Sequence, residues 1–297
     1  MAKTKESFFE HLAEELKTYG DCMVPVKAWF WERHLIKKAS IQKLHPNPED
    51  EFCKPEIGPN HHIISEYVAR YKRYKSMKDP NSLRWEEPLQ VEKVLPDGYR
   101  ILNGHHRWAA YWNLDVKKAP ISILNLTHES DIQKMLAAST HDKRATLDLD
   151  EVVFWHGEGP AEKPLNFLFS RIYKERMREG IPLLLHYLSK HGYDIWVYSS
   201  NYYSIEYIRH YFRQYTVKVD GIITGTARKT KEGSELTERA ERLFSERYVQ
   251  TLHIDRGMVL RTFSHSKEFE DYPIEESGAD WPRAVMKIVK EIEHHEK

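Results

Sequence analysis

The chain has little of several features that mark specialised classes of protein. Only two of its 297 residues are cysteines, Cys22 and Cys53, which is too few for a disulfide scaffold or a four-cysteine zinc site. No apolar run is long enough to span a bilayer, and the amino-terminal stretch lacks the apolar core of a secretion signal. These absences predict a cytoplasmic protein without a membrane partner.

An excess of charge of one sign is also lacking. Lys plus Arg and Asp plus Glu number 45 each, so the formal net charge is zero. A balanced chain is not attracted as a whole to nucleic acid, so we do not favour nucleic acid as the partner, although a local basic site is compatible with this balance. The sequence contains no internal repeat and no low-complexity tract, and its length is typical of two domains. The oligomeric state is not indicated.

The pattern along the chain predicts three segments. Residues 1–39 form a helical extension, 40–142 a smaller α+β domain, and 143–297 an α/β domain. In the extension, apolar residues at helical spacing predict an amphipathic helix packed on the body of the protein. These residues are Phe8, Phe9, Leu12 and Leu16.

The middle segment ends in a compact strand, turn and helix pattern. Pro-Asp-Gly at 96–98 predicts a hairpin turn between two apolar runs. The second of these strands, 99–102, leads through Asn103-Gly104 into a helix that contains Arg107. A strand near 120–124 and a helix at 128–139 follow, and the polar residues 140–144 form the predicted join to the last segment.

Strands alternate with helices in the last segment, which predicts a parallel sheet with crossover helices. The expected strands are 145–149, 195–198, 221–224 and 250–254, and the expected intervening helices are 183–191 and 236–246. In such sheets ligands bind beyond the carboxyl ends of the strands. The residues that follow these strands are therefore the candidates for a site.

These strand ends carry the groups that phosphoryl transfer requires. They are Asp148 and Asp150, Ser199 and Ser200, the lysines Lys229 and Lys231, and Asp255. An aspartate can attack phosphorus to form an aspartyl-phosphate, and a second carboxylate two residues later can protonate the leaving oxygen and then activate water. Hard oxygen ligands from Asp148, Asp150 and Asp255 would hold Mg²⁺.

The ordered motifs LDLDEV, IWVYSSN, a lysine and LHID resemble those of the haloacid dehalogenase-like (HAD) phosphohydrolase superfamily across about residues 143–297. The resemblance implies a Rossmannoid parallel sheet. It also implies a nucleophile at Asp148, an acid/base at Asp150 and a metal ligand at Asp255. Ser199 would bind the transferred phosphoryl group, and Lys231, or Lys229 if the helix starts earlier, would steady it.

This sequence departs from that family pattern in two places. Arg256 follows Asp255 where the family often has a second acid, and the first strand, Arg144-Ala145-Thr146-Leu147, is less apolar than usual. The segment 152–194 leaves little or no room for an inserted cap, so the site is open or the amino-terminal half acts as a lid. Two alternatives remain: the acids and serines merely cap a loop and a turn, or the fold binds a ligand without turnover.

The motif GYRILNGHHRWAAYWNL, preceded by KLHPNPEDEF and EEPLQVEKV, resembles the ParB/sulfiredoxin-like superfamily over about residues 40–125. The resemblance implies that its turn, Gly104-His105-His106-Arg107, binds nucleotide phosphates. A glycine turn at a helix start exposes amide groups that attract phosphate oxygens, and Arg107 would add a positive charge. Local packing of His105 and His106 is the alternative interpretation.

Members of that superfamily differ in chemistry. Sulfiredoxins have a reactive cysteine in this turn, where this chain has His105. Chromosome-partition proteins continue into a helical DNA-binding domain, whereas this chain continues into a phosphatase-like half. The similarity is greater to free serine kinases, which carry a GHHR-like turn. A kinase acting on a small hydroxyl substrate would use Glu51 or Glu56 as its base.

The sequence therefore predicts a two-domain phosphotransfer enzyme of the phosphatase type. Its carboxyl-terminal half would hydrolyse a small phosphorylated substrate with Mg²⁺, and its amino-terminal half would bind a nucleotide such as ATP or ADP, or another phosphorylated ligand. The alternatives are a nucleotide-dependent kinase in the amino-terminal half, and a non-catalytic nucleotide sensor or nucleic-acid-processing protein. The identity of the substrate does not follow from the residues.

Overall fold

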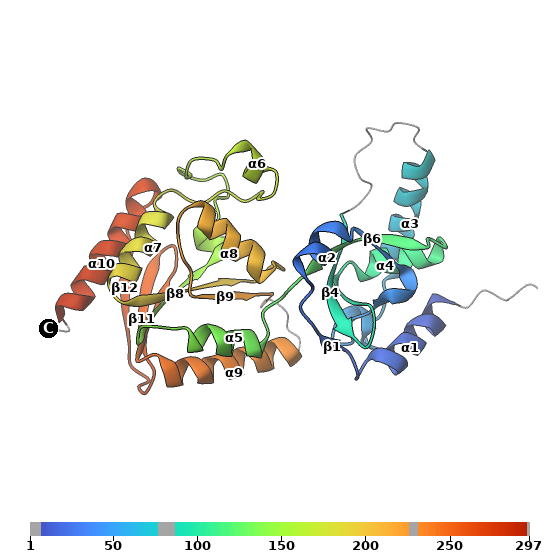
Figure 1. Cartoon of the computed structure of the whole chain (residues 1–297), viewed down its shortest axis with the longest axis horizontal. Coiled ribbons are helices and arrows are strands. Elements are labelled where there is room, and N and C mark those ends of the chain that lie inside the picture. Colours follow the sequence, from blue (N-terminus) through green and yellow to red (C-terminus); the bar gives the residue numbers. More distant parts are fainter. Residues whose placement is uncertain (1–6, 77–86, 226–230, 296–297) are drawn as a thin grey trace, which may run out of the picture. The chain divides into compact units, whose positions relative to one another are not determined.

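The computed structural model describes residues 7–76, 87–225 and 231–295 (Figure 1). The chain divides into two compact units, Met1–Asn125 and Leu126–Lys297. Both units combine helices with sheets that contain parallel and antiparallel strand pairs. Within the described ranges, no helix has the length and apolar character needed to cross a membrane.

The amino-terminal unit is built around one mixed sheet. Its strands are β1 (Val24–Pro25), β2 (Lys38–Ser40), β3 (Leu44–His45), β4 (Leu89–Leu95), β5 (Tyr99–Asn103) and β6 (Lys118–Leu124). Its helices are α1 (Phe8–Tyr19), α2 (Phe30–Leu35), α3 (His61–Ser76) and α4 (His105–Asn113), with short 3₁₀ turns η1 (Ile41–Lys43) and η2 (Glu51–Cys53). The sheet order is β2-β6-β4-β5-β3, and β1 pairs with β4.

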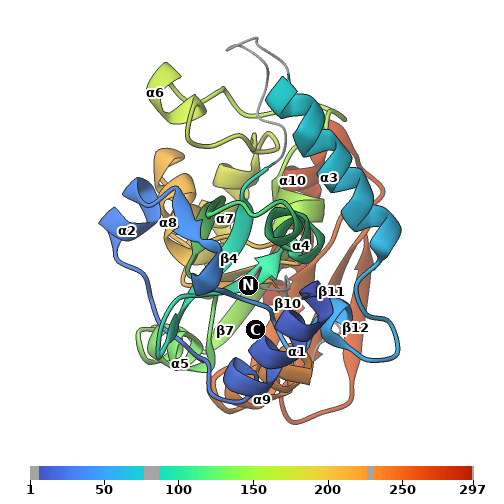
Figure 2. The same ribbon diagram turned by 90° about the vertical axis from the view of Figure 1, so that its right-hand side faces the viewer.

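Strand pairing in this sheet confirms the predicted hairpin, because β4 and β5 are antiparallel and the Pro-Asp-Gly turn joins them. The β6 strand lies parallel to β4 on its other side. Helix α4 follows β5 directly, and α3 lies beside it (Figure 2). The strand, turn and helix order that the sequence predicts is therefore present.

The core of this unit centres on α4, whose Trp108 is fully buried. Helix α1 begins with a capping box formed by Ser7 and Glu10, and it packs Phe8 against Trp108 with the ring centroids 5.3 Å apart. The predicted amphipathic helix is thus present, although Phe9 is 44% exposed. Because α1 contributes Phe8 and Leu12 to the same apolar core as the sheet, residues 1–39 are part of this unit.

The carboxyl-terminal unit contains a second sheet with helices on both faces. Its strands are β7 (Lys143–Asp148), β8 (Tyr193–Ser199), β9 (Gly221–Thr224), β10 (Gln250–Ile254), β11 (Met258–Phe263) and β12 (Phe269–Pro273). Its helices are α5 (Glu129–Ala137), α6 (Phe167–Ser170), α7 (Ile181–Lys190), α8 (Ile205–Gln214), α9 (Lys231–Arg247) and α10 (Trp281–His295), with short turns η3 (Leu149–Val153) and η4 (Gly278–Asp280).

The strand order of this sheet is β12-β11-β10-β7-β8-β9. Strands β10, β7, β8 and β9 are mutually parallel, so the four predicted strands form one parallel block with their carboxyl ends at the same edge. The antiparallel pairs of β11 with β10 and of β12 with β11 extend the block, and the sequence did not reveal them. The segment between β7 and β8 holds η3, a long loop with α6, and α7, in agreement with the small space predicted for a cap.

The two faces of this sheet are covered differently (Figure 1). Helices α7, α8 and α10 bury one face in a large apolar core, which receives Ala145 and Leu147 from β7. Helices α5 and α9 lie side by side over the other face and share a smaller apolar cluster with Trp196. Side chains alternate along a strand, so Arg144, Thr146 and Asp148 face the α9 side.

The boundary between the two units lies earlier than the sequence indicated. The division falls between Asn125 and Leu126 instead of near residues 142–143. Its physical cause is α5, which buries Ile132 and Leu136 in the cluster formed with α9 and Trp196. A helical pattern does not show which apolar surface the helix will cover, so the sequence could not assign α5.

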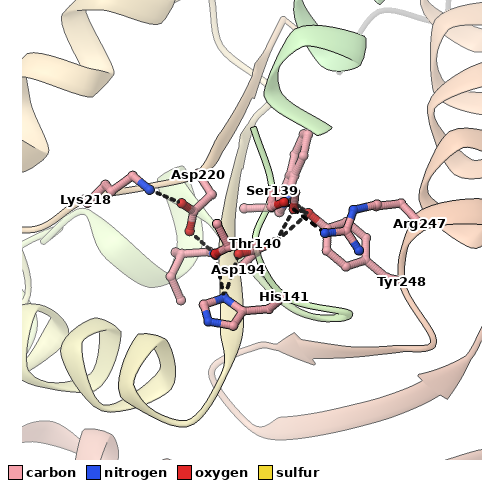
Figure 3. Close-up of polar contacts among 10 residues, drawn as sticks. Ser139, Thr140, His141, Asp194, Lys218, Asp220, Arg247 and Tyr248 are labelled. Carbon is pink, nitrogen blue, oxygen red and sulfur yellow. Dashed lines mark hydrogen bonds and ion pairs between the residues drawn. The ribbon is translucent and has the colours of Figure 1, made fainter. Parts of the chain in front are cut away.

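A polar cluster ties the connection from α5 to β7 to the amino end of β8 (Figure 3). The buried carboxylate of Asp194 accepts hydrogen bonds from the Ser139 and Tyr248 hydroxyls, and its other oxygen lies 2.9 Å from Nδ1 of His141. Arg247 donates to the Ser139 carbonyl at 3.0 Å. In a catalytic triad the serine hydroxyl bonds to the histidine, whereas the hydroxyl of Ser139 bonds to the aspartate. We therefore interpret this cluster as structural: it fixes the connection from α5 to β7 against β8.

Candidate functional site

Asp148 is the last residue of β7 and caps the turn that follows it. Its Oδ1 accepts a 2.8 Å hydrogen bond from the amide of Glu151, and residues 149–153 form a single π-helical turn. Burial raises the pKa of the Asp148 carboxyl, and the Glu151 hydrogen bond opposes that shift. Single π turns are frequent at functional sites, and this one places two carboxylates in close succession beyond the strand.

Asp150 reaches across to the end of β8. Its Oδ2 accepts hydrogen bonds from Ser199 Oγ at 2.7 Å, from the Ser200 amide at 3.0 Å and from Ser200 Oγ at 3.2 Å. Ser199 is fully buried, whereas Ser200 is exposed. The structure thus brings the predicted acid/base and both predicted serines together, with the hydroxyls directed at a carboxylate.

Asp255 follows β10 on the opposite side of β7. Its Oδ1 accepts a 2.6 Å hydrogen bond from the Arg256 amide, and its own amide donates to the Met258 carbonyl at 2.9 Å. Asp255 and Asp148 line the same cavity of about 800 Å³. Strand β10 pairs directly with β7, and this register carries both aspartates to one edge of the sheet as predicted.

Two arginines converge on the backbone beside these acids. Arg256 Nε donates to the Glu151 carbonyl at 2.6 Å, and Arg178 Nη2 donates to the same oxygen at 3.1 Å. Burial and the nearby Arg256 charge lower the pKa of Arg178. The two guanidinium groups bring positive charge to the turn after β7, and Arg256 also lies 4.0 Å from the Glu151 carboxylate and 3.8 Å from the Glu158 carboxylate. Sequence reasoning missed Arg178, because it lies in the loop after α6 and follows no strand.

The predicted lysines cannot be placed in this site. Lys229 lies outside the described residues, and Lys231 opens α9 without a described side chain. Among the described residues, no three His, Cys, Asp or Glu side chains form a group that could hold a metal ion. Oδ2 of Asp150, a predicted metal ligand, accepts hydrogen bonds from Ser199 and Ser200, and the metal role of Asp150 stays a prediction.

The GHHR turn of the amino-terminal unit has the backbone that its sequence predicts. Gly104 adopts φ 106°, a conformation in which a side chain is strained, and α4 begins at the next residue. A Cβ atom at Gly104 would lie 2.6 Å from a Leu89 methyl carbon and 2.9 Å from Arg107 Nη2. The requirement for glycine therefore comes from both the positive φ and the close approach of Leu89 and Arg107.

The side chains of this turn face the protein interior. His105 is buried, and its Nε2 accepts a 3.1 Å hydrogen bond from the Asn47 amide. His106 Nε2 accepts from the Asn60 amide at 3.2 Å, and burial lowers the pKa of His106. Both histidines thus hold the loop between β3 and α3. Nucleotide binding by this turn stays a prediction.

Arg107 is 7% exposed and donates to the Glu87 carbonyl. The sequence suggested an arginine that is available to phosphate, but this guanidinium turns back over Gly104. Glu51 and Glu56, the candidate bases, are exposed in the loop that the two histidines hold. The motif predicts the turn and the start of the helix. It does not predict the burial of Arg107, which depends on the path of the chain before β4.

A separate basic cavity of about 410 Å³ lies in the same unit. Its walls combine lysines with tyrosines and apolar residues from α3, α4 and β6. The lysines are Lys37, Lys38, Lys75 and Lys118. The sequence analysis did not single out these lysines, because they come from segments that only the fold brings together.

Comparison with known families relates part of the chain to one of them. Residues 75–140 match the family described as ParB N-terminal domain. The match supports the predicted resemblance of the amino-terminal half to ParB/sulfiredoxin-like proteins, and it extends beyond Asn125 into α5. Comparison with curated proteins and with solved structures found no match. The resemblance of residues 143–297 to the HAD superfamily stays a prediction.

Proposed function

We propose that the carboxyl-terminal unit is a HAD-like hydrolase that releases phosphate from a phosphomonoester through an aspartyl-phosphate on Asp148. One observation carries the proposal. Side chains from the ends of three adjacent parallel strands lie at one edge of the sheet: Asp148 and Asp255 line one cavity, and Asp150, two residues after Asp148, accepts a hydrogen bond from Ser199. A catalytic set spread over separate strand ends is expected for an α/β enzyme, whereas residues that merely cap loops need not share a cavity.

The chemistry would proceed in two steps. A carboxylate oxygen of Asp148 attacks phosphorus while the bond to the leaving oxygen breaks, and that oxygen takes its proton from Asp150. Asp150 then accepts a proton from water, whose oxygen attacks phosphorus and frees Asp148. The products are the alcohol and inorganic phosphate, and both carboxyl groups return to their initial states. The hydrogen bonds from Ser199 and Ser200 hold Asp150 in place for both transfers.

Magnesium fits the donor set at this edge of the sheet. Mg²⁺ in phosphoryl-transfer sites is commonly held by one or two carboxylates, with water and substrate phosphate completing its coordination. Asp148 and Asp255 would provide those carboxylates. The bound ion would neutralise charge on the phosphoryl group. Arg178 and Arg256 supply positive charge from the chain itself.

The experiment is a phosphate-release screen with Mg²⁺ over phosphorylated metabolites and nucleotides. We compare the intact protein with Asp148→Asn, which keeps the size of the side chain and loses its nucleophilic charge. Release should fall by at least about 10³-fold in the variant, because the covalent route is lost. Undiminished release by Asp148→Asn would overturn the mechanism.

A second candidate function is nucleotide binding by the amino-terminal unit, with or without kinase activity on a small hydroxyl substrate. The basic cavity supports it, because four lysines gather around tyrosine rings in the unit that carries the ParB match. Nucleic acid is the competing ligand for the same charges. Calorimetric titration with ATP, ADP and a short DNA duplex tests this candidate, with Lys38→Glu and Lys118→Glu as variants. Affinities equal to those of the wild type would remove the cavity from consideration.

A further inference from the structure

The cavity that contains Asp148 extends far beyond the two aspartates. It continues along the face of the sheet beneath α9, and its walls include side chains from β7, β8, β10, β11 and α9. A sheet face under a helix is ordinarily packed with apolar side chains. An open space of about 800 Å³ in that position is of the size that binds small molecules.

The sheet face that lines the cavity is polar because the strand register places polar residues of neighbouring strands side by side. Arg144 pairs with Thr251 and Thr146 pairs with His253 across β7 and β10. Thr262 of β11 pairs with Thr251 and continues the row. The intervening residues of β7 and β10 point to the opposite, apolar core. Strand β7 thus presents polar side chains to the cavity on one face of the sheet and apolar side chains to the main core on the other.

Arg144 lies at the end of this row, four residues before Asp148. It is 8% exposed, and it donates to Thr251 Oγ1 at 3.0 Å and to the Tyr198 hydroxyl at 3.2 Å. Its guanidinium carbon lies 4.0 Å from the centroid of the Phe244 ring. The hydrogen-bond and ring partners of Arg144 among the described residues are all neutral: Thr251, Tyr198, and the rings of Phe244 and Tyr248. A buried cation with neutral partners is costly, and an anionic ligand would offset that cost.

His253 continues the polar row through contacts of both its ring nitrogens. Its Nδ1 lies 3.0 Å from Thr146 Oγ1 and its Nε2 lies 3.1 Å from Thr262 Oγ1. Arg144 is the arginine among the described residues that line this cavity, and these residues include no lysine. Burial lowers the pKa of Arg144, and the exposed carboxylate of Glu241 opposes that shift.

We propose that this cavity holds the leaving group of the substrate, and that Arg144 binds a second anionic group, a phosphate or carboxylate, on it. The inference rests on the proposed function, because it places the transferred phosphoryl group at Asp148. Four residues of strand span about 13 Å between Cα atoms. A ligand that reaches from Asp148 to the Arg144 guanidinium is thus of nucleotide length. The substrate class is a phosphomonoester with a second anion at the far end of its leaving group.

The test compares two probes, 1,8-octanediol bisphosphate and octyl phosphate, which share an eight-carbon chain and differ by one anionic group at its far end. Dissociation constants are measured by calorimetry with Mg²⁺ in an Asp148→Asn background, which prevents turnover under the proposed mechanism. The bisphosphate should bind about 10- to 100-fold more tightly than octyl phosphate, because a charge-assisted hydrogen bond forms in a buried site. In Arg144→Gln this ratio should fall to about one.

Three further proteins separate ligand binding from folding. Arg144→Lys keeps the charge and should retain part of the ratio. Ser245→Trp fills the cavity from α9 without altering Arg144, and it should weaken the binding of both probes while inorganic phosphate still binds. Arg242→Gln removes an exposed arginine of α9 outside the cavity and should preserve the wild-type ratio. Circular dichroism establishes that each variant is folded.

The inference is overturned if the two probes bind equally well to the Asp148→Asn protein. It is also overturned if the bisphosphate keeps its advantage when Arg144→Gln is added. The result is distinguishable from failure of the proposed function. If the intact protein releases no phosphate from any ester but shows the Arg144-dependent ratio, the hydrolase proposal fails and the anion site stands.

Discussion

The hydroxyl of Ser199 donates a 2.7 Å hydrogen bond to Oδ2 of Asp150, although the two residues are separated by the whole crossover between β7 and β8. The bond joins the ends of neighbouring strands and fixes the proposed acid/base by a group that is itself fully buried. Its neighbour Ser200 is exposed and donates to the same oxygen through both its amide and its hydroxyl. The two serines therefore have different roles.

Ser199→Ala should lower phosphate release by about 10- to 100-fold, because Asp150 loses its buried donor and its fixed orientation. The loss of the hydrogen bond should also destabilise the protein by about 1 kcal/mol. Ser200→Ala is the matched control, since its amide continues to donate to Asp150. Release assays and urea unfolding measure both effects, and equal losses in the two variants would contradict the assignment.

Gly104→Ala should destabilise the amino-terminal unit by about 2 kcal/mol or more, because of the positive φ and the contact with Leu89. Gly257→Ala is the control, because its Cβ would meet nothing within 4 Å. Urea unfolding followed by tryptophan fluorescence provides the measurement. A Gly104→Ala protein as stable as the Gly257→Ala protein would show that the turn relaxes.

Burial and the charge of Arg144 lower the pKa of His253 to about 4, which predicts a loss of stability in acid. The unfolded imidazole takes up a proton as the pH falls through about 6.5, whereas the folded one does so only near 4. The unfolded state therefore binds more protons between these values, and the free energy of unfolding decreases as the pH falls, by at most about 3 kcal/mol. Urea unfolding at pH 7 and pH 5 should show a larger decrease for the wild type than for His253→Gln. Identical decreases would indicate that His253 protonates freely in the folded state.

Truncation tests where the carboxyl-terminal unit begins. A fragment of residues 126–297 should fold cooperatively, whereas 143–297 should not, because removal of α5 takes away the apolar residues that cover Trp196 and Phe244. Thermal unfolding measured by circular dichroism distinguishes the two fragments. A sharp transition in the shorter fragment would show that α5 is dispensable.

The strand ends could be predicted from the sequence because each depends on a short local pattern. An apolar run followed by Asp148 or Ser199 shows where a strand stops, and parallel pairing brings such ends to one edge. Strand β12 escaped prediction because its residues are largely exposed and do not alternate between apolar and polar. The burial of Arg107 was not predictable either, since it depends on a carbonyl twenty residues away in the chain.

The inner cavity illustrates the same limit at a larger scale. Arg144 and Thr146 interrupt an apolar strand, and the sequence registers only that the strand is unusual. The reason lies in the placement of α9 and in the register of β10 and β11, which no local pattern encodes.

The division of β7 between two walls has a consequence for protein engineering. Ala145 and Leu147 pack in the main core, so changes there alter packing and are paid for in stability. Arg144, Thr146 and their partners on β10 border open space, where side chains can change size with little effect on packing. A library randomised at 144, 146, 251 and 253 should therefore retain many folded members while varying in ligand preference. Randomisation of 145, 147, 252 and 254, one residue out of phase, should yield mostly unfolded chains.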